Sequence, residues 1–195
     1  MTMLQSTVKH LRQLQQSNDS DARLDSIKYC TVIMALARNN HASEAHEVLM
    51  DMTNVYQNDL SQDLKPDIKV YHAVLSAWSR HGAAPDHAAN QASDILARLW
   101  SLSKHDRSMQ PTTYTYNNVL FSFKSAKQAW RAQALLEEMK DRAKQRRLNP
   151  PDVTTYRVVL ETWHRSSDAA KKSQIRLLTR EYTVRFGGSP PAFRK

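Results

Sequence analysis

The stretch YNNVLFSFKS, residues 116–125, is written three more times in this chain, as YCTVIMALAR at 29–38, YHAVLSAWSR at 71–80 and YRVVLETWHR at 156–165. Each copy places large apolar residues at its first, fourth, fifth and eighth positions, which form one face of an α-helix. The tyrosines that open successive copies are 42, 45 and 40 residues apart. A helix that recurs at this period predicts an all-α solenoid of stacked helix-turn-helix repeats.

A second apolar pattern follows each of the first three copies, in which a small residue precedes aliphatic residues three, four and seven positions further on. Its best copy is Ala132, Leu135, Leu136 and Met139. A turn with proline, such as Pro66-Asp67, then precedes the next tyrosine, because proline ends a helix and Asp or Thr caps the one that follows. The expected unit is therefore a first helix (helix A), a short turn, a second helix (helix B) and a proline turn.

These patterns divide the chain into about four units with degenerate ends. The N-terminal segment is amphipathic and suits either an incomplete repeat or a weak targeting segment. The fourth unit departs from the helix B pattern, as a capping helix does. The predicted segments are 1–25 (N-terminal helix), 26–67, 68–112 and 113–152 (repeats), 153–184 (degenerate or capping repeat) and 185–195 (flexible basic tail).

The composition argues against several functional classes. The chain has three glycines, none of them in a phosphate-binding loop or a nucleophile turn. Its single cysteine, Cys30, excludes an internal disulfide and a cysteine-based zinc site. No apolar run approaches the ~20 residues that span a membrane. We expect no enzyme activity and no catalytic residue. We also expect no metal site, no cofactor, no small-molecule substrate and no membrane association.

The positive charge is concentrated in the last third of the chain. Residues 1–123 hold 11 Lys and Arg against 12 Asp and Glu, whereas residues 124–195 hold 17 against 7. Such an asymmetry indicates an anionic partner, with nucleic acid as the first candidate. Basic helices that are merely solvated are the alternative explanation.

The Tyr-x-x-Val-Ile/Leu helix, the Ala-x-x-Leu-Leu-x-x-Met helix and the closing Pro-Asp together resemble the pentatricopeptide repeat family. The similarity runs from about Asp25 to Trp163. The tetratricopeptide repeat is the nearest competitor, but its Trp-x-x-Leu-Gly-x-x-Tyr helix has no counterpart here. The resemblance implies that single-stranded RNA binds along the concave face formed by the A helices, with one base per repeat.

The resemblance also assigns positions in this sequence to the RNA. The residue after each tyrosine and the last residue of the same repeat contact the base together, which gives Cys30 with Asp67, His72 with Thr112, Asn117 with Asp152, and Arg157 with no identifiable partner. The residue two before each tyrosine flanks the base, which gives Ile27, Lys69, Tyr114 and Thr154. A cation late in helix A meets the phosphates, which gives Arg38, Arg80, Lys124 and Arg165. Asn with Asp is the family's combination for uracil.

The sequence leaves two functional hypotheses open. The first is a single-stranded RNA-binding protein that acts by occupying RNA in organellar RNA processing, stability or translation. The alternative is a protein-interaction scaffold on the same solenoid, within an organellar ribonucleoprotein. Positive charge that lines one groove on the A helices would favour RNA, and charge scattered over the B helices would favour the scaffold.

The expected location is a mitochondrion or plastid, mainly because of the family resemblance. Residues 1–18 contain no acidic residue and hold Lys9 and Arg12, as a weak transit peptide does. The same residues also suit helix B of an incomplete repeat.

Overall fold

The computed structural model describes residues 25–59, 64–146 and 149–190. Short and long helices alternate in these ranges, and the described residues contain no strand. The A helices have 13 residues each: α2 (Ser26–Arg38), α4 (Ile68–Arg80), α6 (Thr113–Ser125) and α8 (Val153–Arg165). The B helices are α3 (Ala42–Asp59), α5 (Pro85–Leu102), α7 (Ala129–Arg146) and α9 (Lys171–Phe186), and a 3₁₀ turn, η2 (Arg107–Met109), precedes α6.

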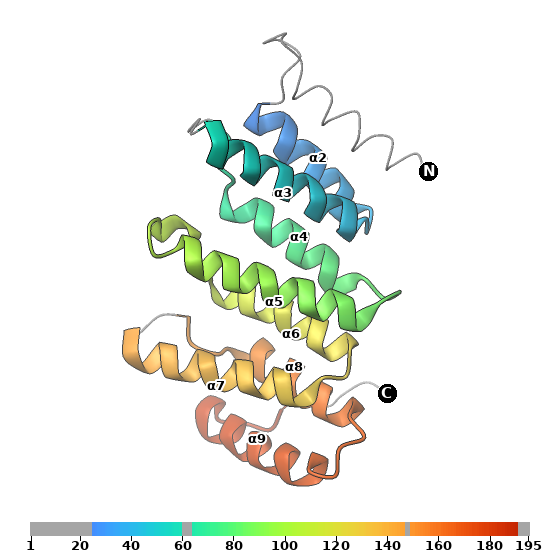
Figure 1. Cartoon of the computed structure of the whole chain (residues 1–195). Coiled ribbons are helices and arrows are strands. Elements are labelled where there is room, and N and C mark those ends of the chain that lie inside the picture. Colours follow the sequence, from blue (N-terminus) through green and yellow to red (C-terminus); the bar gives the residue numbers. More distant parts are fainter. Residues whose placement is uncertain (1–24, 60–63, 147–148, 191–195) are drawn as a thin grey trace.

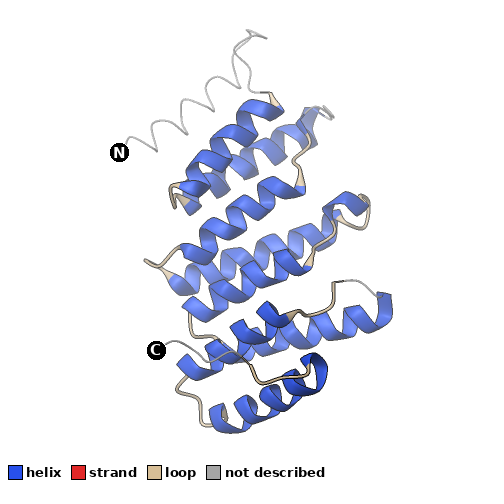
Figure 2. Cartoon of the chain, turned by 180° about the vertical axis from the view of Figure 1, so that it is seen from behind, coloured by secondary structure: helices blue, strands red, loops and turns tan. Residues whose placement is uncertain are grey.

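The helices stack as hairpins in two layers, with the B helices in front in Figure 1 and the A helices in front in the reverse view of Figure 2. Each A helix packs against the A helix of the next unit, so α2, α4, α6 and α8 form a continuous row. Each of α3, α5 and α7 packs against its own A helix and the following one. Within the described ranges, no two B helices form a closely packed pair. The prediction of an all-α repeat solenoid is confirmed.

Each A helix is capped by the side chain of the residue that precedes it. Asp25, Asp67 and Asp152 each accept a hydrogen bond from a backbone N–H of the first turn, at 2.7, 2.8 and 2.7 Å. Thr112 does the same for α6 at 3.4 Å, and its own N–H donates to the hydroxyl of Thr115 at 3.0 Å. These contacts satisfy backbone groups that would otherwise lack a partner at a helix start.

The repeated apolar face is the core, as the sequence predicts. The four tyrosines that open the copies are at most 3% exposed, and the two tryptophans on the same face are at most 2% exposed. The small residues of the B helices, such as Ala92 and Ala132, are fully buried. One hydrophobic cluster runs through all four units, so the stack is a single cooperative core rather than separate hairpins.

The C-terminal boundary of the last helix differs from the prediction. We placed the start of the flexible tail at Arg185, but α9 continues through Phe186 and ends at Gly187, which has a φ of +75°. The Phe186 ring lies 5.6 Å from that of Tyr156 and 4.9 Å from that of Tyr182, so packing extends the helix beyond the point that the sequence pattern indicated. The segments 1–24 and 191–195 lie outside the described residues.

Candidate RNA-binding face

Two neighbouring grooves run along the A helices, and we call the surface that holds them the A face. The groove between α2 and α4 has a volume of about 300 Å³, and the groove between α4, α6 and the start of α8 has a volume of about 670 Å³. Both are lined by Ser76, Arg80 and Tyr114, so the two grooves adjoin. The predicted site residues that line one or both are Arg38, Lys69, His72, Arg80, Tyr114, Asn117, Lys124, Asp152 and Thr154.

The pair predicted to read uracil is joined in the structure. The amide nitrogen of Asn117 donates to both carboxylate oxygens of Asp152, at 3.3 and 3.4 Å. The hydroxyl of Thr155 donates to the amide oxygen of Asn117 at 2.8 Å. Because both ends of the carboxamide are held, its orientation is set before any ligand arrives. One N–H and one oxygen lone pair remain for a base in the larger groove.

His72 occupies the same place one unit earlier, and its side chain bonds Thr115 and not Thr112, the residue with which it is predicted to contact a base. Its Nε2 shares a 2.8 Å hydrogen bond with the hydroxyl of Thr115, whereas Thr112 caps α6. The ring stands edge-on to Tyr114, with 5.0 Å between the ring centroids. Burial lowers the pKa of His72, and the nearby Asp67 carboxylate opposes this shift in part. The imidazole is therefore neutral at neutral pH.

The outer two units show no comparable pair. Cys30 is half-buried, and Asp67 is exposed and caps α4 through the backbone N–H of Lys69. The position that holds Thr115 and Thr155 in the later units is Val70 here, so no hydroxyl faces Cys30. In the last unit, the Arg157 guanidinium lies 4.0 Å from the carboxylate of Glu161 on the same helix.

The base-flanking positions differ strongly in what they offer a nucleobase. Tyr114 is 54% exposed, so its ring can stack on a base. Ile27 is 77% exposed at the start of α2. Lys69 lines the smaller groove and Thr154 the larger one. Tyr114 is thus the only aromatic stacking surface among the four.

Arg80, predicted to contact phosphate, also holds two repeats together. Its guanidinium donates to the side-chain oxygen of Asn40 at 3.1 Å and to the backbone oxygen of Ala37 at 2.9 Å. A further N–H donates to the hydroxyl of Ser76. Ala37 lies in the last turn of α2, so Arg80 closes the C-terminus of the preceding A helix. Part of its donor capacity is therefore already used.

Lys124 is likewise engaged within the protein. Its ammonium lies 3.0 Å from the carboxylate of Glu161 and 4.9 Å from the centroid of the Phe121 ring. Glu161 also approaches Arg157, so one acid lies between two cations that we expected to face RNA. This arrangement lowers the positive potential of the A face near α8.

Arg38 and Arg165 are exposed, and neither forms an ion pair or hydrogen bond with another described residue. Arg38 lines the smaller groove, whereas Arg165 lies outside both grooves, at the C-terminal end of α8. Three of the four predicted phosphate contacts therefore lie along two adjoining grooves, and the fourth lies beyond their end.

Three polar residues that shape the A face escaped the sequence analysis. Thr115 and Thr155 are fully buried and orient His72 and Asn117, and Glu161 neutralises Lys124. The signal for the threonines is their position directly before Tyr116 and Tyr156, one helical turn from the predicted caps. Their contact with the preceding unit depends on how the A helices stack, which one sequence does not reveal.

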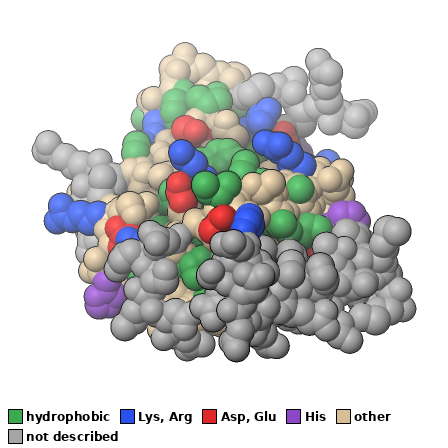
Figure 3. Space-filling model, turned by 90° about the horizontal axis from the view of Figure 1, so that it is seen from above, with side chains coloured by type: hydrophobic (Ala, Val, Ile, Leu, Met, Phe, Trp, Pro, Cys, Tyr) green, Lys and Arg blue, Asp and Glu red, His purple; other side chains and the backbone are tan. Residues whose placement is uncertain are grey.

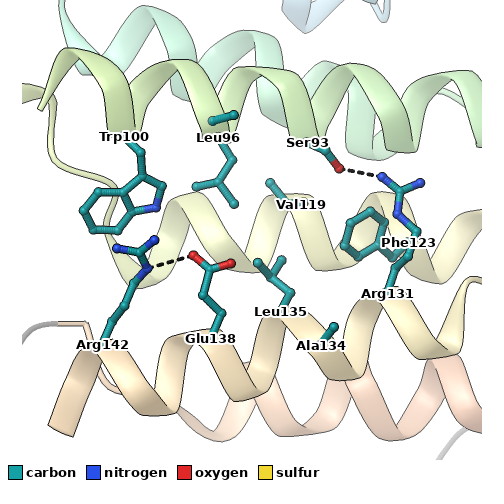
Figure 4. Close-up of a pocket in the computed structure, with 11 residues that line it drawn as sticks. Ser93, Leu96, Trp100, Val119, Phe123, Arg131, Ala134, Leu135, Glu138 and Arg142 are labelled. Carbon is teal, nitrogen blue, oxygen red and sulfur yellow. Dashed lines mark hydrogen bonds and ion pairs between the residues drawn. The ribbon is translucent and has the colours of Figure 1, made fainter. Parts of the chain in front are cut away.

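A third groove lies on the opposite side, between the B helices α5 and α7, and has a volume of about 530 Å³. Figure 4 shows Leu96 and Trp100 of α5 facing Leu135 of α7 across it. At its two ends Arg131 donates to Ser93 at 2.8 Å, and Arg142 donates to Glu138 at 2.7 Å. The Arg142 guanidinium also stacks on the Trp100 ring at 3.9 Å. Arg131, Arg142 and Glu138 therefore already have partners within the protein.

Neither a metal site nor a membrane span accompanies these grooves. Among the residues that the structure describes, no group of three or more His, Cys, Asp and Glu side chains could hold a metal ion. In the same residues, no helix combines the length and apolar character that crossing a bilayer requires.

The stacked helical hairpins and the polar A face define a helical-repeat protein of the kind that binds an extended ligand. A family model described as the PPR repeat matches the chain at residues 28–54, within α2 and α3, and at residues 114–142, within α6 and α7. The chain therefore contains pentatricopeptide repeats at these two places, and proteins with such repeats typically bind single-stranded RNA. No curated protein matches the chain.

Proposed function

We propose that this protein binds single-stranded RNA along the A face and reads a uracil at the unit formed by α6 and the start of α8. The observation that carries the proposal is the carboxamide of Asn117, held between Asp152 and Thr155. Uracil presents an N–H donor between two carbonyl acceptors. An oriented carboxamide, with one N–H and one oxygen lone pair free, complements that edge.

The neighbouring residues of the larger groove support the same ligand. The exposed face of Tyr114 offers stacking worth roughly 1–3 kcal/mol per base. Arg80 and Lys124 line the groove, but both are partly committed to contacts within the protein. We therefore expect a modest electrostatic contribution, with few phosphates neutralised and a salt dependence of about −0.7 per phosphate.

The test compares the native chain with Asn117→Ala on labelled oligouridine and oligocytidine by fluorescence anisotropy. The native chain is expected to prefer oligouridine, and Asn117→Ala is expected to lose that preference at a cost of about 1–3 kcal/mol. Asn90→Ala is the matched control, because Asn90 lies on α5 and bonds Arg131 away from the A face. Equal loss in both variants, or no binding of the native chain at low salt, would refute the proposal.

The proposed biological role is to occupy RNA in organellar RNA processing, stability or translation. This role rests on the family resemblance, and so does the proposed compartment, a mitochondrion or plastid. Imaging of the tagged full chain with organelle markers tests it, and a diffuse distribution outside both organelles would exclude it.

A second candidate function, a protein-interaction scaffold, is favoured by one specific observation. The groove between α5 and α7 is lined by the half-buried Trp100 and the exposed Ala97 and Ala134, on the side away from the A face. Amphipathic helices of partner proteins bind in grooves of this kind. Ala134→Glu, at an exposed position of the groove lining, is expected to abolish such an interaction while oligouridine binding is retained.

A further inference from the structure

The outward side of α9 carries a line of three cations, Lys172, Arg176 and Arg180, which we call the α9 stripe. They are spaced four residues apart, so they share one helix face and extend over about 12 Å. All three are exposed, and none has an ion-pair or hydrogen-bond partner among the described residues. Figure 3 shows the molecule from above the view of Figure 1, and on the surface visible there Lys and Arg lie among Asp and Glu. The α9 stripe, by contrast, contains cations alone.

The acidic residue of α9 does not neutralise the stripe. The carboxylate of Glu181 faces α7, where both its oxygens accept from the Lys140 ammonium at 2.6 and 2.7 Å. Gln174 accepts from Gln133 of α7 at 3.0 Å, and Leu178 and Tyr182 are buried beneath the helix. The helix is therefore fixed on the stack by its inner side, and its outer side keeps an uncompensated positive charge.

Local helix energetics oppose this arrangement. Like charges four residues apart destabilise a helix by about 0.2–0.5 kcal/mol per pair. Lys171 and Lys172 also lie in the first turn of α9, where the helix dipole disfavours cations. A capping helix needs a polar outer side, but residues of either charge provide it. Helix α3, at the other end, has four acidic residues and no Lys or Arg. Capping alone therefore leaves the single sign of the stripe unexplained.

The stripe begins where the A face ends. Only residues 166–170 separate Arg165, the last residue of α8, from the start of α9. The Lys171 ammonium donates to the backbone oxygen of His164, which places the start of α9 against the C-terminus of α8. An extended polyanion that passes Arg165 would therefore reach Lys172 first, and then Arg176 and Arg180.

We propose that the α9 stripe binds the phosphates of RNA that continues past the A face at Arg165. The proposal rests on the proposed function, because it requires RNA on the A face. The stripe contains no aromatic side chain and no amide, so its contacts are to the backbone and independent of base sequence. Its effect is to lengthen the bound segment beyond the one base per unit that the A face accommodates.

The experiment measures anisotropy of the full chain with labelled oligouridines of about six and about sixteen nucleotides across a salt series. The shorter RNA covers the four units, and only the longer one reaches α9. The variant Lys172→Gln/Arg176→Gln/Arg180→Gln removes the stripe without removing any described contact. The control Lys104→Gln/Arg107→Gln/Lys144→Gln removes three exposed cations, two that follow α5 and one in the last turn of α7.

The native chain is expected to bind the longer RNA more tightly, with a salt slope steeper by about 2. The stripe variant should lose this difference, about tenfold in affinity, and bind the shorter RNA unchanged. The control triple should keep the difference. If the native chain does not bind the shorter RNA, the proposed function itself is refuted.

Three results would overturn the inference while leaving that function intact. These are equal affinity of the native chain for both lengths, full long-RNA binding by the stripe variant, and equal losses in the two triple variants. Leu177 and Val184 are 60% and 82% exposed beside the stripe, as in a surface that contacts a protein. Labelled polyglutamate is therefore tested in parallel as a substitute for an acidic protein. If the stripe variant loses polyglutamate binding alone, α9 docks an acidic protein and not RNA.

Discussion

Three residues at the same place in successive A helices show how much a single contact decides. Asn117 is held by Asp152 and Thr155, His72 is held by Thr115, and Cys30 faces no hydroxyl because Val70 stands at the corresponding position. A polar group must be oriented to read a base, since a freely rotating group gives little discrimination. Specificity is therefore expected at Asn117 and decreases toward the first unit.

Arg80 and Arg38 occupy equivalent positions but differ in what they contact, which gives a test of stability. Arg80→Ala removes hydrogen bonds to Asn40, Ser76 and the C-terminus of α2, and is expected to lower the free energy of unfolding by about 1–2 kcal/mol. Arg38→Ala is expected to change it by less than about 0.5 kcal/mol. Urea denaturation followed by circular dichroism measures both. Equal values would show that Arg80 does not join the repeats.

At the scale of the helix, the same residue can start an element and serve the site. Asp152 caps α8 through the backbone N–H of Thr155 at 2.7 Å and also accepts from Asn117 of the preceding A helix. The start of one helix thereby orients the base-reading group of its neighbour. Asp67 caps α4 in the same way at 2.8 Å but has no described contact with Cys30.

This double role separates two substitutions at Asp152. Asparagine caps helices about as well as aspartate, so Asp152→Asn is expected to keep the free energy of unfolding within about 0.5 kcal/mol. It should nevertheless weaken the uridine preference, because the second acceptor for Asn117 becomes a donor. Asp152→Ala should lose both, with about 1 kcal/mol of stability.

Asp67→Asn is the matched control for this pair of measurements, and should change neither stability nor base preference. Thermal denaturation and anisotropy on oligouridine give the two values. An unchanged uridine preference in Asp152→Asn would mean that the carboxylate does not orient Asn117.

At the scale of the whole molecule, stability is expected to decrease as the pH falls. The pKa values of His46, His72 and His164 are all lowered, in each case mainly by burial. The unfolded chain then binds these protons at a higher pH than the folded chain does, so their contribution is complete above pH 6.5 and decreases below it. The three histidines lie in different units, so acidification is expected to destabilise the whole stack rather than one hairpin.

The thermal midpoint of the native chain should therefore be lower at pH 5.5 than at pH 7.5. His72→Gln should reduce this difference, because one of the three titrating groups is removed. A midpoint that rises on acidification would contradict the direction of the three shifts.

Much of the stack could be predicted because its determinants are local. The four copies give the A helices, the Asp or Thr before each copy gives its cap, and the buried tyrosines and tryptophans follow from one periodic face. The end of α9 was misplaced because its continuation to Phe186 depends on contact with Tyr156, which is 30 residues away in the sequence. Tertiary packing overrides local signals most easily at such ends.

The sequence by itself determined that this chain is a row of helical hairpins and which side chains share the buried apolar face, because helical periodicity and capping act over a few residues. Only the tertiary structure decided which of those side chains are oriented, neutralised or free. Thr155 reaches Asn117, Glu161 pairs with Lys124, and Arg80 closes α2, all across the boundary between units. Contacts between residues about 40 positions apart depend on how the hairpins stack, and that geometry is a property of the packed core.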